Sequence, residues 1–234
     1  KARNKKMLAV LLDPDKCFGE LMEKMLDQLK SFHPDFIFIG GSSKNCFTDD
    51  LLNQLADIPV PKVLFPGDAS QFTPKADALL FLSLISGRNT DYLIGQHVHS
   101  ALKIKKSGIE VIPVGYILID GGTDSAVKRV SKTNPIRSND VEKSVSTAVA
   151  GELLGMKMIY LEAGSGALNP VSAEIISAVK SELNTPLIVG GGIKTTAQLK
   201  TALEAGADLV VVGNVFESET ERIEEFVRVV EEFL

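Results

Sequence analysis

The chain has 234 residues, and its 30 acidic side chains outnumber its 25 lysines and arginines, for a formal net charge of −5. A chain of this length can bury a core without disulfides. The length therefore excludes a small scaffold that depends on disulfides. Cys17 and Cys46 form no CxxC pair of the kind that indicates zinc. The negative balance argues against a nucleic-acid partner, because phosphate backbones are held mainly by clustered lysine and arginine. No apolar run reaches the ~20 residues that span a bilayer, so we expect a cytoplasmic protein with a possible peripheral membrane contact. We also expect a single domain over residues 1–234.

Short apolar runs recur along the chain and are continuously apolar, which is typical of strands buried on both faces of a parallel sheet. They predict eight strands: Leu8–Leu12, Phe36–Ile39, Lys62–Phe65, Ala78–Ile85, Glu110–Ile119, Met158–Leu161, Leu187–Val189 and Leu209–Val212. Amphipathic stretches between them predict seven helices: Phe18–Phe32, Asp49–Ala56, Tyr92–Lys106, Asp140–Leu154, Ala173–Leu183, Thr196–Ala205 and Glu219–Phe233. Strict alternation of strand and helix predicts a (β/α)₈ TIM barrel, with an open doubly wound sheet as the alternative.

Two connections depart from this regular pattern. Between Phe65 and Ala78 the chain has only PGDASQFTPKAD, which is too short and too interrupted by proline and glycine for a crossover helix. We therefore expect a modified barrel whose third helix is missing or replaced by a loop. The second connection, Asp120–Asn139, is long and polar, and connections of this length are often lids or binding loops.

Glycines gather at the carboxyl ends of the last strands, where a barrel of this class carries its site. The seventh strand ends in Gly190–Gly192, and the eighth ends in Gly213 followed by Asn214. Glycine lets backbone N–H groups approach an anion closely, and a following helix N-terminus adds a positive dipole end. These glycines therefore predict a phosphate site, to which Gly164–Gly166 could contribute; the alternative is that they only make tight turns.

The strand ends also carry acidic and hydroxyl side chains. Asp13 ends the first strand and Ser42 follows the second, its neighbour in a barrel. A carboxylate and a hydroxyl oxygen, completed by substrate oxygens, suit Mg²⁺, whereas the alternative is that Asp13 and Asp15 only cap a turn. Glu162 ends the sixth strand, where an isolated buried carboxylate is costly. It is either a general base, with Tyr160 on the same face of the strand, or half of a structural ion pair.

Eight motifs follow one another along nearly the whole chain: LLDPDK (Leu11–Lys16), GGS (Gly40–Ser42), LFPG (Leu64–Gly67), SLISGRN followed by LIG (Ser83–Gly95), PVGYILID (Pro113–Asp120), YLEAGSGA (Tyr160–Ala167), VGGGI (Val189–Ile193) and VVGN (Val211–Asn214). Together they resemble the geranylgeranylglyceryl phosphate synthase family, which includes bacterial heptaprenylglyceryl phosphate synthases. YLEAGSGA is more similar to the archaeal-type enzymes than to the heptaprenyl branch. The missing third helix also matches the modified barrel of the family.

The resemblance implies a Mg²⁺-dependent transfer of the geranylgeranyl group from its diphosphate to the C3 hydroxyl of sn-glycerol 1-phosphate, an ether-forming step of phospholipid biosynthesis. It implies Asp13 and Ser42 as Mg²⁺ ligands and Glu162 as the residue that activates the hydroxyl. With Tyr160 on the same face of the strand, Glu162 and Tyr160 are the expected catalytic residues. The implied contacts to glycerol 1-phosphate are Tyr160, Leu161, Glu162, Ala163, Gly164, Ser165, Gly166, Gly191, Gly192, Gly213 and Asn214. A homo-oligomer, dimer or hexamer, is also implied.

Such an activity needs an apolar groove for the prenyl tail. The expected wall is Phe65–Phe72, Ala78–Ile85 and Tyr92, next to the opening left by the third helix, although each of these residues could instead be ordinary core. Lys128 and Arg129 are either attractors for the diphosphate or part of a solvated surface. The alternative functions are the same reaction with another prenyl length, a sugar-phosphate isomerase or aldolase barrel, and a non-catalytic barrel that binds phosphate or lipid.

Overall fold

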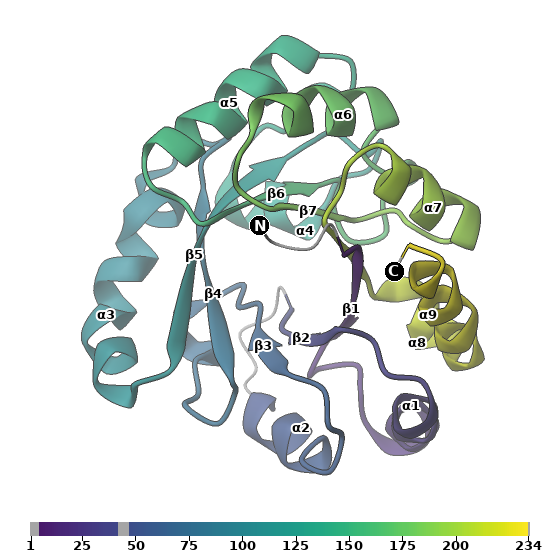
Figure 1. The fold of residues 1–234 in the computed structure, drawn as a ribbon. Coiled ribbons are helices and arrows are strands. Elements are labelled where there is room, and N and C mark those ends of the chain that lie inside the picture. Colours follow the sequence, from purple (N-terminus) through teal and green to yellow (C-terminus); the bar gives the residue numbers. More distant parts are fainter. Residues whose placement is uncertain (1–4, 42–46, 234) are drawn as a thin grey trace.

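Eight parallel strands close into a barrel in sequence order in the computed structural model, which describes residues 5–41 and 47–233 (Figure 1). The strands are β1 (Met7–Leu12), β2 (Phe36–Ile39), β3 (Lys62–Leu64), β4 (Ala78–Leu84), β5 (Glu110–Leu118), β6 (Met158–Glu162), β7 (Leu187–Gly190) and β8 (Leu209–Val212). Leu8 of β1 pairs with Val210 of β8, which completes the circle of hydrogen bonds. The predicted barrel is confirmed, and the open sheet is wrong.

Helices surround the barrel, as Figure 1 shows. They are α1 (Gly19–Ser31), α2 (Thr48–Gln54), α3 (Gln96–Ser107), α4 (Ala126–Ser131), α5 (Val141–Leu153), α6 (Ala173–Glu182), α7 (Thr196–Glu204), α8 (Asn214–Ser218) and α9 (Ile223–Glu231). Three single turns accompany them: η1 (Ala69–Gln71), η2 (Asp91–Gly95) and η3 (Thr220–Arg222). The short helices α4 and α8 were not predicted, and the predicted helix Tyr92–Lys106 divides into the π-helical turn η2 and α3.

The third crossover contains only the 3₁₀ turn η1, so the predicted loss of the third helix is confirmed. Asp68 caps this turn by accepting a hydrogen bond of 2.9 Å from the backbone N–H of Ser70. In Figure 1, α2 and α3 stand on either side of this part of the barrel. The strands behind the loop are therefore not covered by a full helix.

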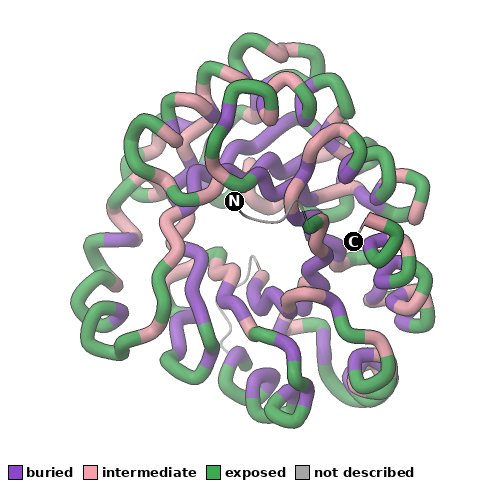
Figure 2. Tube along the Cα trace, in the orientation of Figure 1, coloured by how far each residue is buried: buried purple, intermediate pink, exposed green. Residues whose placement is uncertain are grey.

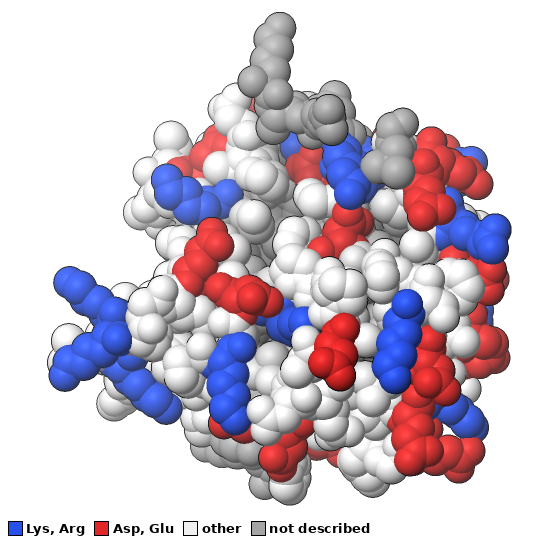
Figure 3. Space-filling view, turned by 60° about the horizontal axis from the view of Figure 1, so that its bottom comes forward, with Lys and Arg blue, Asp and Glu red and all other residues white. Residues whose placement is uncertain are grey.

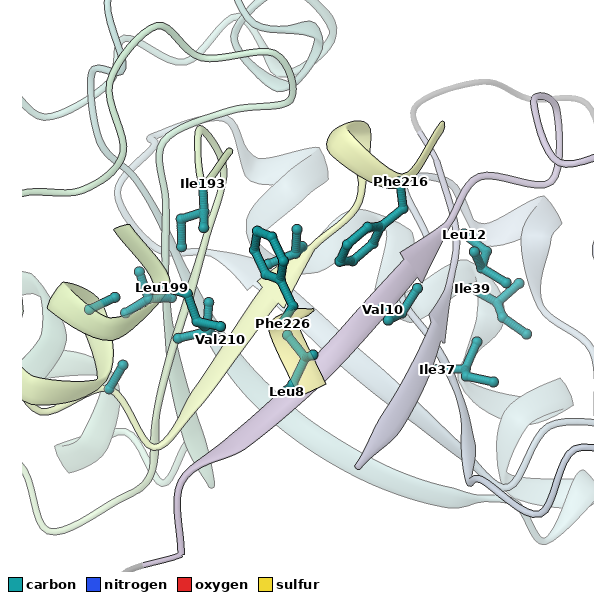
Figure 4. Packing of buried hydrophobic residues seen from close by; sticks show 14 of the residues in the cluster. Leu8, Val10, Leu12, Ile37, Ile39, Ile193, Leu199, Val210, Phe216 and Phe226 are labelled. Carbon is teal, nitrogen blue, oxygen red and sulfur yellow. The ribbon is translucent and has the colours of Figure 1, made fainter. Parts of the chain in front are cut away.

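Two apolar layers hold the barrel together, because successive side chains of a strand point to opposite faces. Ala9 of β1 faces the interior, whereas Leu8 and Val10 pack outward against the helices. Figure 4 shows this outer layer around β1, where the rings of Phe216 and Phe226 meet edge to face at 5.2 Å. Burial follows the same division, with buried residues along the strands and exposed residues on the outer faces of the helices (Figure 2). Polar side chains in the interior therefore need a separate explanation.

The long polar connection after β5 is structured. Ser125 caps α4 by accepting from the N–H of Lys128, and Asn89 donates to the carbonyl oxygen of Ser131 at 2.8 Å. Ile136 returns to pair with Ile119 at the end of β5. These contacts hold α4 over the carboxyl ends of the strands. Across the described ranges, the helices are all too short or too polar to cross a bilayer.

Candidate active site

A cavity opens at the carboxyl ends of the strands and extends outward beside β4. Its empty space, open mouth included, is about 1720 Å³. The polar end is formed by the strand-end loops that the sequence singles out, and it includes Asp13, Glu162, Ser165, Gly166, Gly191, Gly192, Gly213 and Asn214. The other end is apolar. The structure thus brings most of the predicted site residues to one cavity.

Glu162 is the centre of the polar end. It is the last residue of β6 and only 6% exposed. Its Oε1 accepts a hydrogen bond of 2.7 Å from the N–H of Gly164, and the hydroxyl groups of Tyr160 and Tyr116 donate to the same carboxylate. Within the described part of the chain, no lysine or arginine pairs with Glu162, which favours the general-base interpretation over the structural ion pair.

The electrostatics of this group suit proton transfer. Burial raises the pKa of Glu162 from 4.5 to about 7, although the hydrogen bonds from Gly164, Tyr160 and Tyr116 act in the opposite direction. A carboxyl with a pKa near neutrality is partly ionised at working pH and can both take and return a proton. Burial also raises the pKa of Tyr116 and Tyr160 well above their ordinary value. Both tyrosines therefore stay neutral and serve as donors to Glu162.

The glycines at the end of β7 leave room for this cluster. A Cβ at Gly190 would overlap the hydroxyl oxygen of Tyr160, and one at Gly191 would overlap Oε1 of Glu162. Gly191 also has a φ of +80°, which disfavours any residue with a side chain. These glycines are needed for close approach, so they do more than make a tight turn.

The loops after β6 and β8 meet across the cavity. Ser165 Oγ donates to Oδ1 of Asn214 at 3.0 Å. Three predicted contacts lie differently: Leu161 and Ala163 pack in the outer layer, and Gly164 directs its N–H to Glu162. None of these three residues lines the cavity.

Asp13 caps a turn and also faces the cavity. Its Oδ1 accepts from the N–H of Asp15 at 3.1 Å, which caps the turn after β1, and its Oδ2 lies 3.9 Å from Nζ of Lys16. The carboxylate also lines the cavity, and a Cβ at Gly41 would overlap it, so Gly41 leaves it room. Ser42, the other predicted ligand, lies outside the described residues.

Asp13 fits a Mg²⁺ site in which the protein supplies few ligands and the substrate and water supply the rest. Among the residues that the structure describes, no three His, Cys, Asp or Glu side chains gather as a metal cage. Mg²⁺ is usually held by one or two carboxylates together with substrate phosphates and waters. Asp13 offers one such carboxylate at the wall of the cavity, which matches that pattern.

The apolar end of the cavity is lined by the predicted wall. Phe65–Phe72, β4 and Tyr92 all contribute to it. Both faces of β4 are used, since Leu80 belongs to the inner layer and Leu79 to the outer one. Beyond the expected wall, the lining includes Gln96, His97, Ser100 and Ile104 on α3 and Ala126, Val127, Val130 and Ser131 on α4.

Several residues at the site were not predicted from the sequence. The main one is Tyr116, which lies directly opposite Tyr160 on the neighbouring strand. The pairing register of the two strands is what could have indicated it. Lys16 and Lys194 also line the cavity, and Lys16 pairs with Glu217 at 2.9 Å. By contrast, Lys128 and Arg129 do not line the cavity. Both pair with Asp124 on the surface, which favours the solvated-surface alternative for them.

The fold and site together define a (β/α)₈ barrel with a buried carboxylate of raised pKa at the strand ends and an apolar groove beside it. The chain belongs to the PcrB family, whose family model matches residues 2–231. The geranylgeranylglyceryl phosphate synthase of Zunongwangia profunda is 51% identical over 92% of this chain and 92% of its own length. That of Pyrococcus horikoshii is 38% identical over 93% of this chain and 86% of its own.

The comparison with solved structures agrees. The (S)-3-O-geranylgeranylglyceryl phosphate synthase of Thermoplasma acidophilum, crystallised with its substrate sn-glycerol 1-phosphate, superposes with a TM-score of 0.90. It is 32% identical, and the match covers 98% of this chain and 94% of that one. The resemblance drawn from the sequence motifs is confirmed.

Proposed function

We propose that this protein transfers a prenyl group from its diphosphate to the C3 hydroxyl of sn-glycerol 1-phosphate. The observation that carries the proposal is the position of Glu162, a buried carboxylate at the point where glycine-rich loops meet an apolar groove. The bound substrate of the Thermoplasma acidophilum relative supports sn-glycerol 1-phosphate as the acceptor, and its name supports the C3 oxygen. A sugar-phosphate isomerase or aldolase would have no use for the apolar groove.

The acceptor phosphate belongs at the glycine-rich end. There the loops after β6, β7 and β8 converge around Ser165, Gly191, Gly192 and Asn214. Backbone N–H groups at such turns hold an anion without a basic side chain. A held phosphate fixes the glycerol hydroxyl beside Glu162, and this positioning removes part of the entropic barrier.

Glu162 takes the proton of the C3 hydroxyl. The C3 oxygen then forms a bond to C1 of the prenyl group while the bond from C1 to the diphosphate oxygen breaks. The proton ends on Glu162, and diphosphate leaves with the electron pair. Tyr160 and Tyr116 donate to the carboxylate and hold its orientation during this transfer.

Asp13 would hold Mg²⁺ together with oxygens of the diphosphate, and Ser42 is the second proposed ligand. When bound, the ion neutralises charge on the departing diphosphate. The basic side chain of Lys16 lies close to Asp13 and lines the same cavity. The acceptor and the leaving group would therefore bind at different strand ends, with Glu162 between the phosphate loops and the groove.

Geranylgeranyl diphosphate is the proposed donor, because the relatives are named geranylgeranylglyceryl phosphate synthases. We also propose a homo-oligomer, dimer or hexamer, in the cytoplasm.

A turnover assay tests the function directly. The protein is incubated with Mg²⁺, sn-glycerol 1-phosphate and a ladder of donors from farnesyl to heptaprenyl diphosphate. We expect an organic-extractable phosphate ether, with geranylgeranyl diphosphate as the best donor. If another prenyl diphosphate is the best donor, only the proposed length of the prenyl group changes. No product with any donor would refute the function.

A further inference from the structure

The helix α3 has an apolar face that nothing in the described structure covers. Ile94, at the end of η2, and Val98 and Leu102 on α3 are 58%, 68% and 72% exposed. They follow one another at intervals of four residues, so they align along one side of the helix. Large apolar side chains rarely form such a row on a surface without a partner.

The inward side of the same helix lines the groove. His97, Ser100 and Ile104 contribute to the cavity wall, and His97 contacts the ring of Phe81 edge-on at 4.3 Å. The helix therefore has two functional sides, one that lines the groove and an apolar one that faces the solvent. Only the first is explained by the proposed function.

The charge of α3 is opposite to that of the whole protein. Between Gln96 and Ser107 the sequence has Lys103, Lys105 and Lys106 and no acidic residue, in a chain of net charge −5. Lys105 and Lys106 form no ion pair with any described residue. In Figure 3 basic side chains gather at the left edge of the molecule, on the side where Figure 1 places α3.

The position of the helix connects this surface with the opening in the barrel. Nζ of Lys103 lies 5.1 Å from the centre of the Phe72 ring, and Phe72 belongs to the loop that replaces the third helix. Lys103, which follows Leu102 of the exposed row, thus lies at the edge of this opening.

An apolar row beside lysines is the pattern of a helix that lies in the head-group region of a membrane. We propose that η2 and α3 dock on a lipid surface that carries anionic head groups. Ile94, Val98 and Leu102 enter the head-group region, while Lys105 and Lys106 contact lipid phosphates. The choice of a lipid surface over a second copy of this chain rests on the proposed function, because prenyl diphosphate and ether product have long tails that partition into membranes.

Co-sedimentation with vesicles tests the proposal. One set of vesicles is pure phosphatidylcholine, and the other is an equal mixture of phosphatidylcholine and phosphatidylglycerol. We expect the wild type to bind the mixed vesicles and to be released by salt. The double variant Val98→Gln/Leu102→Gln should bind about tenfold more weakly, and Lys105→Gln/Lys106→Gln should lose about fivefold per lysine. The matched control is Leu153→Gln/Leu154→Gln, an equally exposed apolar pair on α5, which should bind like the wild type.

Three results would overturn the proposal. The wild type fails to bind either vesicle, or the control variant loses as much binding as the α3 variant. The third is that Val98→Gln/Leu102→Gln lowers the oligomeric state in light scattering, which would assign the face to a second copy. Turnover of detergent-dispersed substrates separates this test from the test of the function. The α3 variants should keep that turnover, and vesicle binding by a protein without turnover would refute the function while supporting the docking surface.

Discussion

Replacing Glu162 by glutamine preserves the shape of the side chain and removes its charge. In the folded protein burial raises the pKa of Glu162 from 4.5 to about 7. One pKa unit corresponds to about 1.4 kcal/mol, so the difference of about 2.5 units means that ionised Glu162 costs the folded state about 3 kcal/mol. The group is almost fully buried, so solvent screening reduces this cost little.

The sign of the pH dependence follows from proton binding. Below pH 4.5 both the folded and the unfolded states carry the proton, and the carboxyl costs nothing. Between pH 4.5 and about 7 the unfolded chain releases the proton while the folded state keeps it, so the free energy of unfolding falls as pH rises. Glutamine does not titrate. The stability of Glu162→Gln relative to the wild type should therefore increase by about 3 kcal/mol across this window and stay constant above it.

Urea unfolding of both proteins at a series of pH values measures this difference. The other titrating groups cancel, because both proteins contain them. A difference that is the same at pH 5 and pH 8 would refute the raised pKa of Glu162.

The same variant tests the assignment of the base. Without the carboxylate, kcat should fall by about 100- to 10,000-fold, while binding of sn-glycerol 1-phosphate remains nearly intact. In the wild type, kcat/KM should rise with pH through about 7, because the base acts in its ionised form. A fully active Glu162→Gln would show that another group takes the proton.

Three further substitutions test the surroundings of Glu162. Tyr116→Phe removes a hydrogen bond that lowers the pKa of Glu162, so the acid limb of the kcat/KM profile should move to higher pH; an unmoved limb would show that Tyr116 only fills space. Gly191→Ala places a Cβ against Glu162 at a φ of +80°, and the free energy of unfolding in urea should fall by about 2 kcal/mol or more; an unchanged midpoint would contradict the close approach. Asp13→Asn should weaken Mg²⁺ binding, titrated calorimetrically in the presence of diphosphate, by at least about tenfold, and equal affinity would remove Asp13 from the ligand set.

The barrel was predictable because its strands coincide with continuous apolar runs in the sequence. Phe36–Ile39 and Leu209–Val212 agree with β2 and β8 to the residue. The loss of the third helix was predictable from the segment after Phe65, which is too short and too interrupted by proline and glycine for a crossover helix. Both conclusions depend on local composition, which a single sequence contains.

The short helices were not predictable in the same way. A helix of six residues such as α4 gains little from its own hydrogen bonds after the cost of nucleation. It is held by its Ser125 cap and by the contact from Asn89, which lies far away in the sequence. Only the folded barrel brings Asn89 and Ser131 together.

The site shows the same limit residue by residue. The run from Tyr160 to Gly166 looked like one continuous binding segment, but strand alternation turns Leu161 outward while Tyr160 and Glu162 face the cavity. Tyr116 was not singled out from the sequence, because its role depends on the register between β5 and β6. Sequence motifs identify which loops form the site, whereas the register of the strands decides which atoms meet there.

The missing helix connects the fold with the proposed chemistry. In a complete barrel a helix between β3 and β4 would cover the outer side chains of β4, and Leu79 and Phe81 would be packed beneath it. Here these side chains line the groove together with Leu80 and Leu82 of the same strand. The polar end of the cavity remains at the strand ends, where backbone N–H groups can hold anions despite the net charge of −5. The absence of one helix therefore leaves a barrel in which an apolar groove opens within reach of Glu162 and the glycine-rich strand ends.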